Sequence, residues 1–155
     1  MGYTAEEWAE RIGRRLDITF WLTHLTRRTG SRSAVDVLLS ILEERKLRAA
    51  PAKTYGGQHV VCFQDAPLHG VFQNLESERR MRGLKKKEGT KRPVFRYEAV
   101  GVMFMKQDVF AAGGRPVLYE HPDKARGILP REEWWRIVAL NLDADPPLDW
   151  THERE

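Results

Sequence analysis

The feature that most constrains the fold is that candidate functional side chains lie at opposite ends of the sequence. The chain has 155 residues; His24 lies near its start, and a Glu-x-Glu pair, Glu153 and Glu155, lies at its end. In a strand, alternate residues point to one face, so both carboxylates can line one pocket while Arg154 points away. A site that uses these residues requires a fold that brings both ends together. The alternative is a frayed, charged chain end.

The size and composition describe one folded domain. A chain of 155 residues with 41% hydrophobic and 31% charged residues is unlike a disordered segment, and it can bury roughly 70% of the surface of its unfolded chain. No apolar run approaches the ~20 residues of a membrane span, and the acidic start lacks the cationic and apolar regions of a signal peptide. We therefore expect a single domain over residues 1–155, located in the cytoplasm.

The single cysteine, Cys62, cannot form an internal disulfide, which fits a reducing cytoplasm. Its neighbours in Val60-Val61-Cys62-Phe63 are apolar, so we expect an inert, packed thiol rather than a nucleophile. One cysteine among scattered histidines does not make a zinc-binding pattern, and we expect no metal site.

The positive charge is concentrated in one segment. The net charge is +4 and the pI is near 9.4. Residues 76–96 hold nine Lys/Arg against three Glu, a local net charge of +6, so the remaining residues sum to −2. We expect a basic loop over residues 79–96 that attracts DNA or RNA, because Lys/Arg clusters gain affinity for phosphates through counterion release. A solvated loop without a partner is the alternative. The nucleic-acid-binding candidates are Arg79, Arg80, Arg82, Lys85, Lys86, Lys87, Lys91 and Arg92, and Arg96 ends the run.

Helices are indicated by capping signals and by apolar spacing. Thr4 with Glu7, and Ser33 with Asp36, have the spacing of a capping box, which places helix starts directly after them. The predicted helices cover residues 4–16 at the N-terminus, a second stretch after Ser33, the first part of 70–92, 106–112 and 132–140. For the last of these, a strand at 135–140 is the alternative.

Strands are indicated by short β-branched and aromatic runs that end at turn residues. The predicted strands cover residues 18–23, 59–63, 99–105 and 116–120, with Pro67 ending the second one. Asp145-Pro146-Pro147 indicates a turn before a final extended piece over 148–155. With helices and strands mixed along the chain and no linker or repeat, the sequence predicts one α+β domain.

Four residues or pairs of residues stand where strands end or bend. His24, between Thr23 and Thr26, can bond a ligand's ribose or phosphate, or it can be a satisfied edge histidine. Gln64 and Asp65 can point into a site, or they can form a polar turn.

The other two groups are Gly101 and the tyrosines. Gly101 permits close approach by a ligand or by another strand. Tyr97 can stack on a flat heterocycle, although core or edge packing is the alternative for both Tyr97 and Tyr119.

Read together, six segments resemble the ADP-ribosyltransferase-like toxin and phage-defence superfamily, with the DarT-type and AbiG-like bacterial proteins as the nearest kinds. They occur in the family's order over residues 20–155, nearly the whole chain. These segments are Thr23-His24-Leu25-Thr26, Ser40 to Leu47, Val61-Cys62-Phe63-Gln64-Asp65-Ala66-Pro67-Leu68, Tyr97-Glu98-Ala99-Val100-Gly101-Val102, Gly114-Arg115-Pro116-Val117-Leu118-Tyr119, and Asp149 to Glu155. The resembling proteins continue the last segment with Trp-Arg and an apolar strand, beyond the point where this sequence stops.

The resemblance implies a split, mixed or antiparallel β-sheet with flanking helices that holds NAD, as a substrate, in a central cleft. It implies that His24 holds the NAD ribose with Thr26 nearby, and that Tyr97, or else Tyr119, stacks on nicotinamide. It also implies that Glu155 is the catalytic carboxylate. Breaking the nicotinamide–ribose bond builds oxocarbenium character on the sugar, and a carboxylate bonded to the ribose 2′-hydroxyl stabilises that charge. Glu153 would then orient the acceptor.

The function implied is transfer of ADP-ribose to a nucleic acid or protein acceptor, or hydrolysis of NAD, in bacterial toxin or antiphage defence. The alternative is a non-catalytic module of the same fold that binds nucleic acid or protein, such as an antitoxin or a regulatory subunit.

Overall fold

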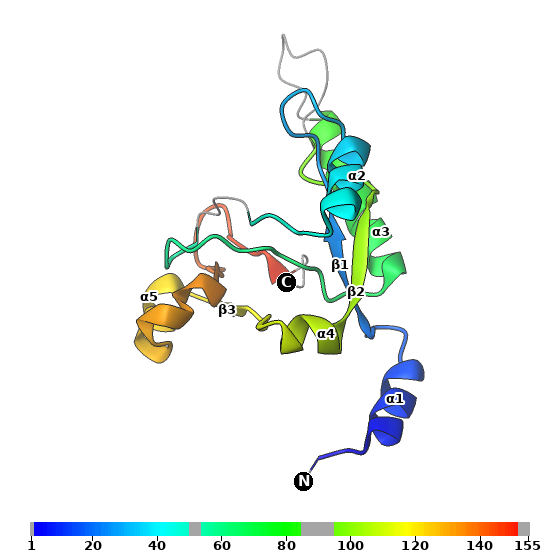
Figure 1. Cartoon of the computed structure of the whole chain (residues 1–155). Helices are drawn as coiled ribbons and strands as arrows, with labels where there is room; N and C mark the ends of the chain where they lie inside the picture. Colours follow the sequence, from blue (N-terminus) through cyan, green and yellow to red (C-terminus); the bar gives the residue numbers. More distant parts are fainter. Residues whose placement is uncertain (1, 50–53, 85–94, 152–155) are drawn as a thin grey trace.

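The computed structural model describes residues 2–49, 54–84 and 95–151. Within them the chain forms a small α+β domain with two separate two-stranded sheets, which confirms the predicted class (Figure 1). The elements in chain order are α1 (Ala5–Gly13), β1 (Trp21–Leu25), α2 (Ala34–Glu44), α3 (Leu68–Leu84), β2 (Gly101–Met105), α4 (Lys106–Ala111), β3 (Leu118–Glu120), α5 (Pro122–Ile128), η1 (Arg131–Arg136, a 3-10 helix) and β4 (Ile137–Ala139).

The first two helices begin where their capping boxes predicted. The Thr4 hydroxyl accepts from the Glu7 N–H at 3.2 Å, and the Thr4 N–H donates to the Glu7 carboxylate at 2.8 Å. α1 ends at Gly13 rather than at residue 16, and Leu16 is 84% exposed. α1 has no buried residue; its Trp8 ring meets the Phe20 ring edge to face at 5.1 Å. In Figure 1 this helix stands away from the sheets.

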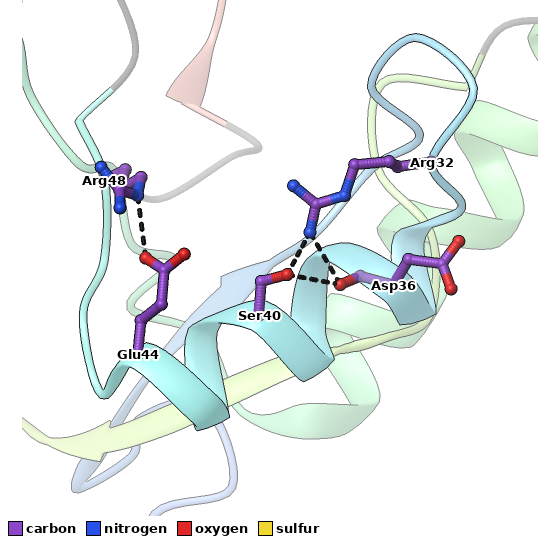
Figure 2. A network of polar contacts seen from close by, with 5 residues as sticks. All are labelled: Arg32, Asp36, Ser40, Glu44 and Arg48. Carbon is purple, nitrogen blue, oxygen red and sulfur yellow. Dashed lines mark hydrogen bonds and ion pairs between the residues drawn. The ribbon is translucent and has the colours of Figure 1, made fainter.

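The N-terminal end of α2 is tied to the preceding turn. The Ser33 N–H donates to the Asp36 carboxylate at 2.8 Å, and the Asp36 N–H donates to the Ser33 hydroxyl at 3.1 Å. Figure 2 shows how Arg32 extends these contacts along the helix: its guanidinium donates to the Asp36 carbonyl oxygen at 3.0 Å and to the Ser40 hydroxyl. The capping box therefore belongs to a larger network that holds the turn at residues 29–32, closed by two backbone hydrogen bonds between Thr29 and Arg32, against α2.

These bonds lower the pKa of the Asp36 carboxyl below its ordinary 3.8, first through the Ser33 hydroxyl and then through the Ser33 N–H. A lowered folded-state pKa stabilises the protein above pH 3.8, and this contribution is lost as the pH falls through the folded value. We expect Ser33→Ala to cost about 0.5–2 kcal/mol at neutral pH, the usual cost of losing an N-cap. Urea unfolding should show the deficit shrinking below pH 3.8. Ser31→Ala, in the exposed turn, should change little at any pH, and a pH-independent Ser33→Ala deficit would contradict this account.

The first sheet consists of β1 and β2, which pair antiparallel from Trp21 opposite Met105 to Leu25 opposite Gly101. On the other edge of β1, Thr23 and Gln64 exchange two backbone hydrogen bonds of 3.0 and 2.8 Å. A Cβ on Gly101 would lie 2.2 Å from the His24 carbonyl oxygen. The close approach predicted at this glycine is therefore made by another strand.

α3 lies beside this sheet (Figure 1), and the core is at their contact. Val71 and Leu75 of α3 pack with Ala66, and Leu25 and Tyr97 cover this cluster. α3 continues to Leu84, so the basic loop predicted from residue 79 is wrong for residues 79–84, which are helical. A glycine destabilises a helix by only about 1 kcal/mol relative to alanine, and this cost is too small for Gly83 to end α3.

The strand predicted over residues 59–63 does not form, because regular pairing with β1 is confined to Gln64. Val60, Val61 and Phe63 are half-buried and line a pocket instead of a sheet interior. Cys62 is exposed, which corrects the prediction of a packed thiol. An apolar run of about five residues indicates that the segment is buried. It does not distinguish a strand from an extended pocket wall.

The second sheet pairs β3 with β4 in parallel, from Leu118 opposite Ile137 to Glu120 opposite Ala139. The crossover between them contains α5, which the sequence analysis did not predict, and η1. The helix predicted over 132–140 is therefore wrong beyond Arg136, and the alternative strand is confirmed for Ile137–Ala139. Ile137 is 4% exposed, and it is buried where it pairs with Leu118 of β3.

Two features are absent from residues 2–49, 54–84 and 95–151. No helix among them has the length and hydropathy needed to cross a membrane. The same residues contain no group of three or more His, Cys, Asp or Glu side chains that could hold a metal ion.

Candidate functional site

A pocket of about 690 Å³ is lined by residues of both sheets and of the segments between them. β1 contributes Leu22, α4 contributes Val109 and Phe110, and all three residues of β4 border the cavity. The extended segment from Val60 to Phe63 lines it as well. Pockets of 300–1,000 Å³ hold small molecules and cofactors, so this cavity has the size of a ligand site.

Aromatic rings form much of the pocket lining. They come from distant parts of the sequence, and only the tertiary fold brings them together. These six residues are Tyr55, Phe63, Tyr97, Phe110, Trp135 and Trp150. Flat rings of this kind offer faces on which a planar heterocycle can stack.

Charged side chains interrupt the apolar wall near α4. The Lys106 ammonium lies 2.8 Å from both carboxylate oxygens of Asp65, so the two charges balance each other at the pocket surface. The Arg115 guanidinium lies over the Phe110 ring at 4.1 Å and donates to the carbonyl oxygens of Phe110 and Gly114 at 2.9 and 2.7 Å. Arg115 therefore closes the C-terminal end of α4 and holds the Phe110 side of the pocket.

Arg96 lines the pocket and lies over two rings. Its guanidinium carbon lies 4.3 Å from the centroid of Trp150 and 5.5 Å from that of Tyr97, both within the range of cation–π contacts. The backbone N–H of Arg96 donates to the Glu78 carboxylate of α3 at 3.2 Å. Arg96 therefore joins three parts of the chain at the pocket rim: α3, the segment before β2, and the last described residues.

Two of the predicted ligand-binding residues lie at or beside this cavity. Tyr97 lines the pocket and also covers the core cluster. His24 is half-buried in β1; its Nδ1 lies 2.8 Å from the Cys62 carbonyl oxygen, and its ring lies 5.7 Å from that of Phe63. A carbonyl oxygen only accepts, so Nδ1 carries a proton that it donates to Cys62. His24 is not itself a lining residue, but it contacts two residues that are, Cys62 and Phe63.

Thr26 and Tyr119 are not among the lining residues. Tyr119 is half-buried in β3. Thr26 is 3% exposed, and its hydroxyl lies 2.9 Å from the Ala34 carbonyl oxygen and 3.0 Å from that of Val100. In this structure Thr26 ties the end of β1 to the start of α2 and to the residue before β2.

We expect Thr26→Val to lower the free energy of unfolding by about 0.5–1.5 kcal/mol, because it removes the hydrogen bond of a buried hydroxyl while preserving volume. The Val100 carbonyl oxygen still accepts from the backbone N–H of residue 26 in this variant. Urea unfolding measures this loss. Thr29→Val is the control, since the Thr29 side chain is exposed and its hydroxyl reaches a carbonyl oxygen only at 3.5 Å. Equal stabilities of the two variants would contradict this role for Thr26.

The remaining predicted residues fall partly outside the described residues. Glu153 and Glu155 lie beyond them, three and five positions after Trp150 in the sequence. Of the nucleic-acid-binding candidates, Arg79 and Arg80 have exposed side chains on α3, and Arg79 pairs with Glu76 at 3.2 Å. Arg82 also lies in α3. The candidates outside the described residues are Lys85, Lys86, Lys87, Lys91 and Arg92.

Several pocket residues were missed by the sequence analysis. Arg96 was assigned to the basic run, and nothing local separates it from its neighbours there. Trp150 and Trp135 carry no motif, and the Asp65–Lys106 pair joins residues 41 positions apart. Three-dimensional proximity is the only signal that unites them.

Comparisons of the chain with protein family models, with curated proteins and with solved structures find no match.

Proposed function

We propose that this protein binds NAD in the pocket between its two sheets and transfers ADP-ribose to a nucleic acid or protein acceptor, or to water. The observation that carries the proposal is a cavity of about 690 Å³ with aromatic walls and the Arg96 guanidinium at its rim. NAD combines two flat heterocycles with an anionic diphosphate, and the aromatic faces and the cation of this cavity suit both features.

The position of the cavity also supports the proposal. A ligand between β1 and β4 lies where two sheets separate, as expected for a split sheet that holds NAD in a central cleft. We accordingly propose that the fold is ADP-ribosyltransferase-like. Tyr97 is available at the wall for stacking on nicotinamide. His24 contacts two wall residues, Cys62 and Phe63, and we propose that it acts on the ribose from this position.

The chemistry proposed is cleavage of the bond between nicotinamide and the ribose. Nicotinamide leaves as a neutral molecule with the bonding electron pair, and positive charge develops on the ribose carbon and ring oxygen. Glu155 would stabilise this charge through the 2′-hydroxyl. The acceptor's oxygen or nitrogen then bonds to the ribose carbon and gives up its proton, and Glu153 would orient it. Toxin activity or antiphage defence is the proposed setting.

The experiment that tests this proposal incubates the protein with NAD labelled in the ADP-ribose part, together with DNA, RNA or bacterial protein. Transfer predicts free nicotinamide and a labelled acceptor in equal amounts, whereas hydrolysis predicts nicotinamide and free ADP-ribose. If no nicotinamide is released under any of these conditions, including with a C-terminally extended chain, the enzymatic proposal is wrong.

A non-catalytic binding module, such as an antitoxin or a regulatory subunit, predicts a different pattern. The exposed Arg79 and Arg80 side chains on α3 are the observation in its favour. Such a module would release no nicotinamide, yet its affinity for DNA or RNA would fall steeply with salt, because phosphate contacts release counterions. An antitoxin would also co-purify with its cognate toxin.

A further inference from the structure

Asp65 and Lys106 form an ion pair in a pocket lining that is largely apolar and aromatic. The Lys106 ammonium lies 2.8 Å from each Asp65 carboxylate oxygen, and both side chains line the cavity. The Lys106 side chain is 31% exposed and that of Asp65 is 42% exposed. Ion pairs with this much exposure contribute little to stability, so stabilising the fold is a weak reason for placing two charges at this wall.

Backbone hydrogen bonds to β1 and to the residue before it hold both members of the pair. Asp65 directly follows Gln64, which exchanges two backbone hydrogen bonds with Thr23 of β1 at 3.0 and 2.8 Å. The Lys106 N–H donates to the carbonyl oxygen of Phe20, directly before β1, at 2.8 Å. The pair is therefore positioned by its backbone, and side chains on such supports can bind a ligand with a defined geometry.

The pair presents hydrogen-bond acceptors beside hydrogen-bond donors. A carboxylate has about four acceptor sites, and the two hydrogen bonds from Lys106 occupy two of them. An ammonium has three N–H donors, and these bonds use no more than two of them. The remaining sites suit a flat ring whose edge carries an amino group beside an acceptor. A carboxamide on a ring has this edge, and so does adenine, with its 6-amino group beside a ring nitrogen.

The charges of the pair also determine which ring substituents are disfavoured. Among the lining residues that the structure describes, Asp65 is the only one with a carboxylate. A carboxylate on the ligand's ring would be repelled by Asp65, and its attraction to Lys106 is offset by the same Asp65 charge. A neutral amide can bond to both members of the pair without this repulsion.

We propose that the Asp65–Lys106 pair determines the specificity of this pocket: Asp65 accepts from the amino group of a flat ring, and Lys106 donates to the adjacent acceptor. The pocket thereby selects a ring with a carboxamide or an amino group over the same ring with a carboxylate or without the amino group. NAD offers this edge twice, in nicotinamide and in adenine. This inference rests on the proposed use of the pocket for NAD and names the residues that select it.

The test measures, by calorimetry, the affinity of the full chain for two matched pairs of mononucleotides. Nicotinamide and nicotinic acid mononucleotide differ only in the carboxamide, and AMP and purine riboside monophosphate differ only in the 6-amino group. In the pair whose ring is recognised, the ligand with the amino group should bind about 10- to 100-fold more tightly, the size of a hydrogen bond to a charged group. A preference in one pair alone identifies the ring that the site recognises.

Asp65→Asn keeps the shape of the side chain, removes its negative charge and leaves the Lys106 ammonium unbalanced. Nicotinic acid mononucleotide should then bind at least as tightly as nicotinamide mononucleotide, because the ammonium attracts the ligand's carboxylate. The preference for AMP should fall about 10-fold, because a neutral amide is the weaker acceptor. Lys106→Gln should act in the opposite direction on the first pair and disfavour nicotinic acid mononucleotide further, since the Asp65 charge then lacks its counterion.

Asp123→Asn is the matched control. Asp123 pairs with Arg126 at 3.0 Å, and neither residue lines the pocket. This variant makes the same chemical change in another ion pair and should keep every preference of the unchanged chain.

Three outcomes would overturn the inference: no preference in either pair of ligands, an unchanged preference in Asp65→Asn, or an equal change in Asp123→Asn. The failure of the proposed function is a separate result. A preference that Asp65→Asn abolishes, without nicotinamide release from NAD, would leave this inference standing and refute the enzyme. Nicotinamide release by a chain without a preference in either pair would do the reverse.

Discussion

We expect Glu155→Gln to slow the release of nicotinamide from NAD by about 10²- to 10³-fold, the effect of removing one preorganised electrostatic contact from a transition state. The amide keeps the shape of the carboxylate and can still accept a hydrogen bond from the 2′-hydroxyl. It lacks the negative charge that stabilises the developing oxocarbenium ion. The loss should therefore appear in kcat, and the affinity for ADP should stay within about twofold, because ADP lacks the bond that is cleaved.

Glu43→Gln is the control for this prediction. Glu43 is an exposed glutamate of α2 that does not line the pocket, so the variant removes one carboxylate without touching the site. Its rate should equal that of the unchanged chain. Full activity in Glu155→Gln would show that another group stabilises the transition state, and the assignment carried by the resemblance would then be wrong.

The largest expected loss of stability comes from Gly101→Ala. A Cβ at this position would lie 2.2 Å from the His24 carbonyl oxygen and 3.0 Å from two more backbone atoms of β1. Backbone atoms cannot turn aside as a side chain does, so β1 and β2 would have to separate where Leu25 faces Gly101. Overpacking typically costs 1–3 kcal/mol, and we expect at least about 3 kcal/mol here, a large share of the 5–15 kcal/mol that stabilises a domain.

Gly127→Ala makes the same chemical change where the structure has room. A Cβ on Gly127 meets no atom within 4 Å, and this residue belongs to α5. Alanine in a helix should raise the free energy of unfolding by up to about 1 kcal/mol. Urea unfolding of the two variants should therefore show shifts of opposite sign. A mild effect of Gly101→Ala would mean that β1 and β2 part easily beside His24.

The positions of helix starts could be predicted from the sequence because capping is a local interaction. Thr4 with Glu7, and Ser33 with Asp36, need only three residues of chain to exchange their hydrogen bonds, and both pairs do so. The end of α4 is similarly local. After Ala111, the Gly113 and Gly114 N–H groups donate to the carbonyl oxygens of Phe110 and Val109, three and five residues back. No distant contact is needed to define these ends.

The failures of the sequence analysis concern segments whose partners are distant in the chain. The apolar run before Gln64 resembled a buried strand, yet its burial comes from a pocket wall. Ile137–Ala139 became a strand because β3 lies beside it, and α5 was missed because its short helix depends on packing of Ala125, which is 0% exposed. Periodicity reports that a residue is buried, but it does not report what buries it.

For the candidate site, too, the local features could be predicted and the contacts between distant residues could not. The sequence alone determined the residue types, the strand that carries His24, the local helix caps and the glycine at which two strands approach closely, since each follows from short-range sterics or hydrogen bonding. Only the tertiary structure decided that Tyr97 lines a cavity, that Thr26 is tied into the backbone, and that Arg96 lies over the rings of Tyr97 and Trp150. Those contacts join residues up to 74 positions apart, and their geometry is set by how the two sheets are held together.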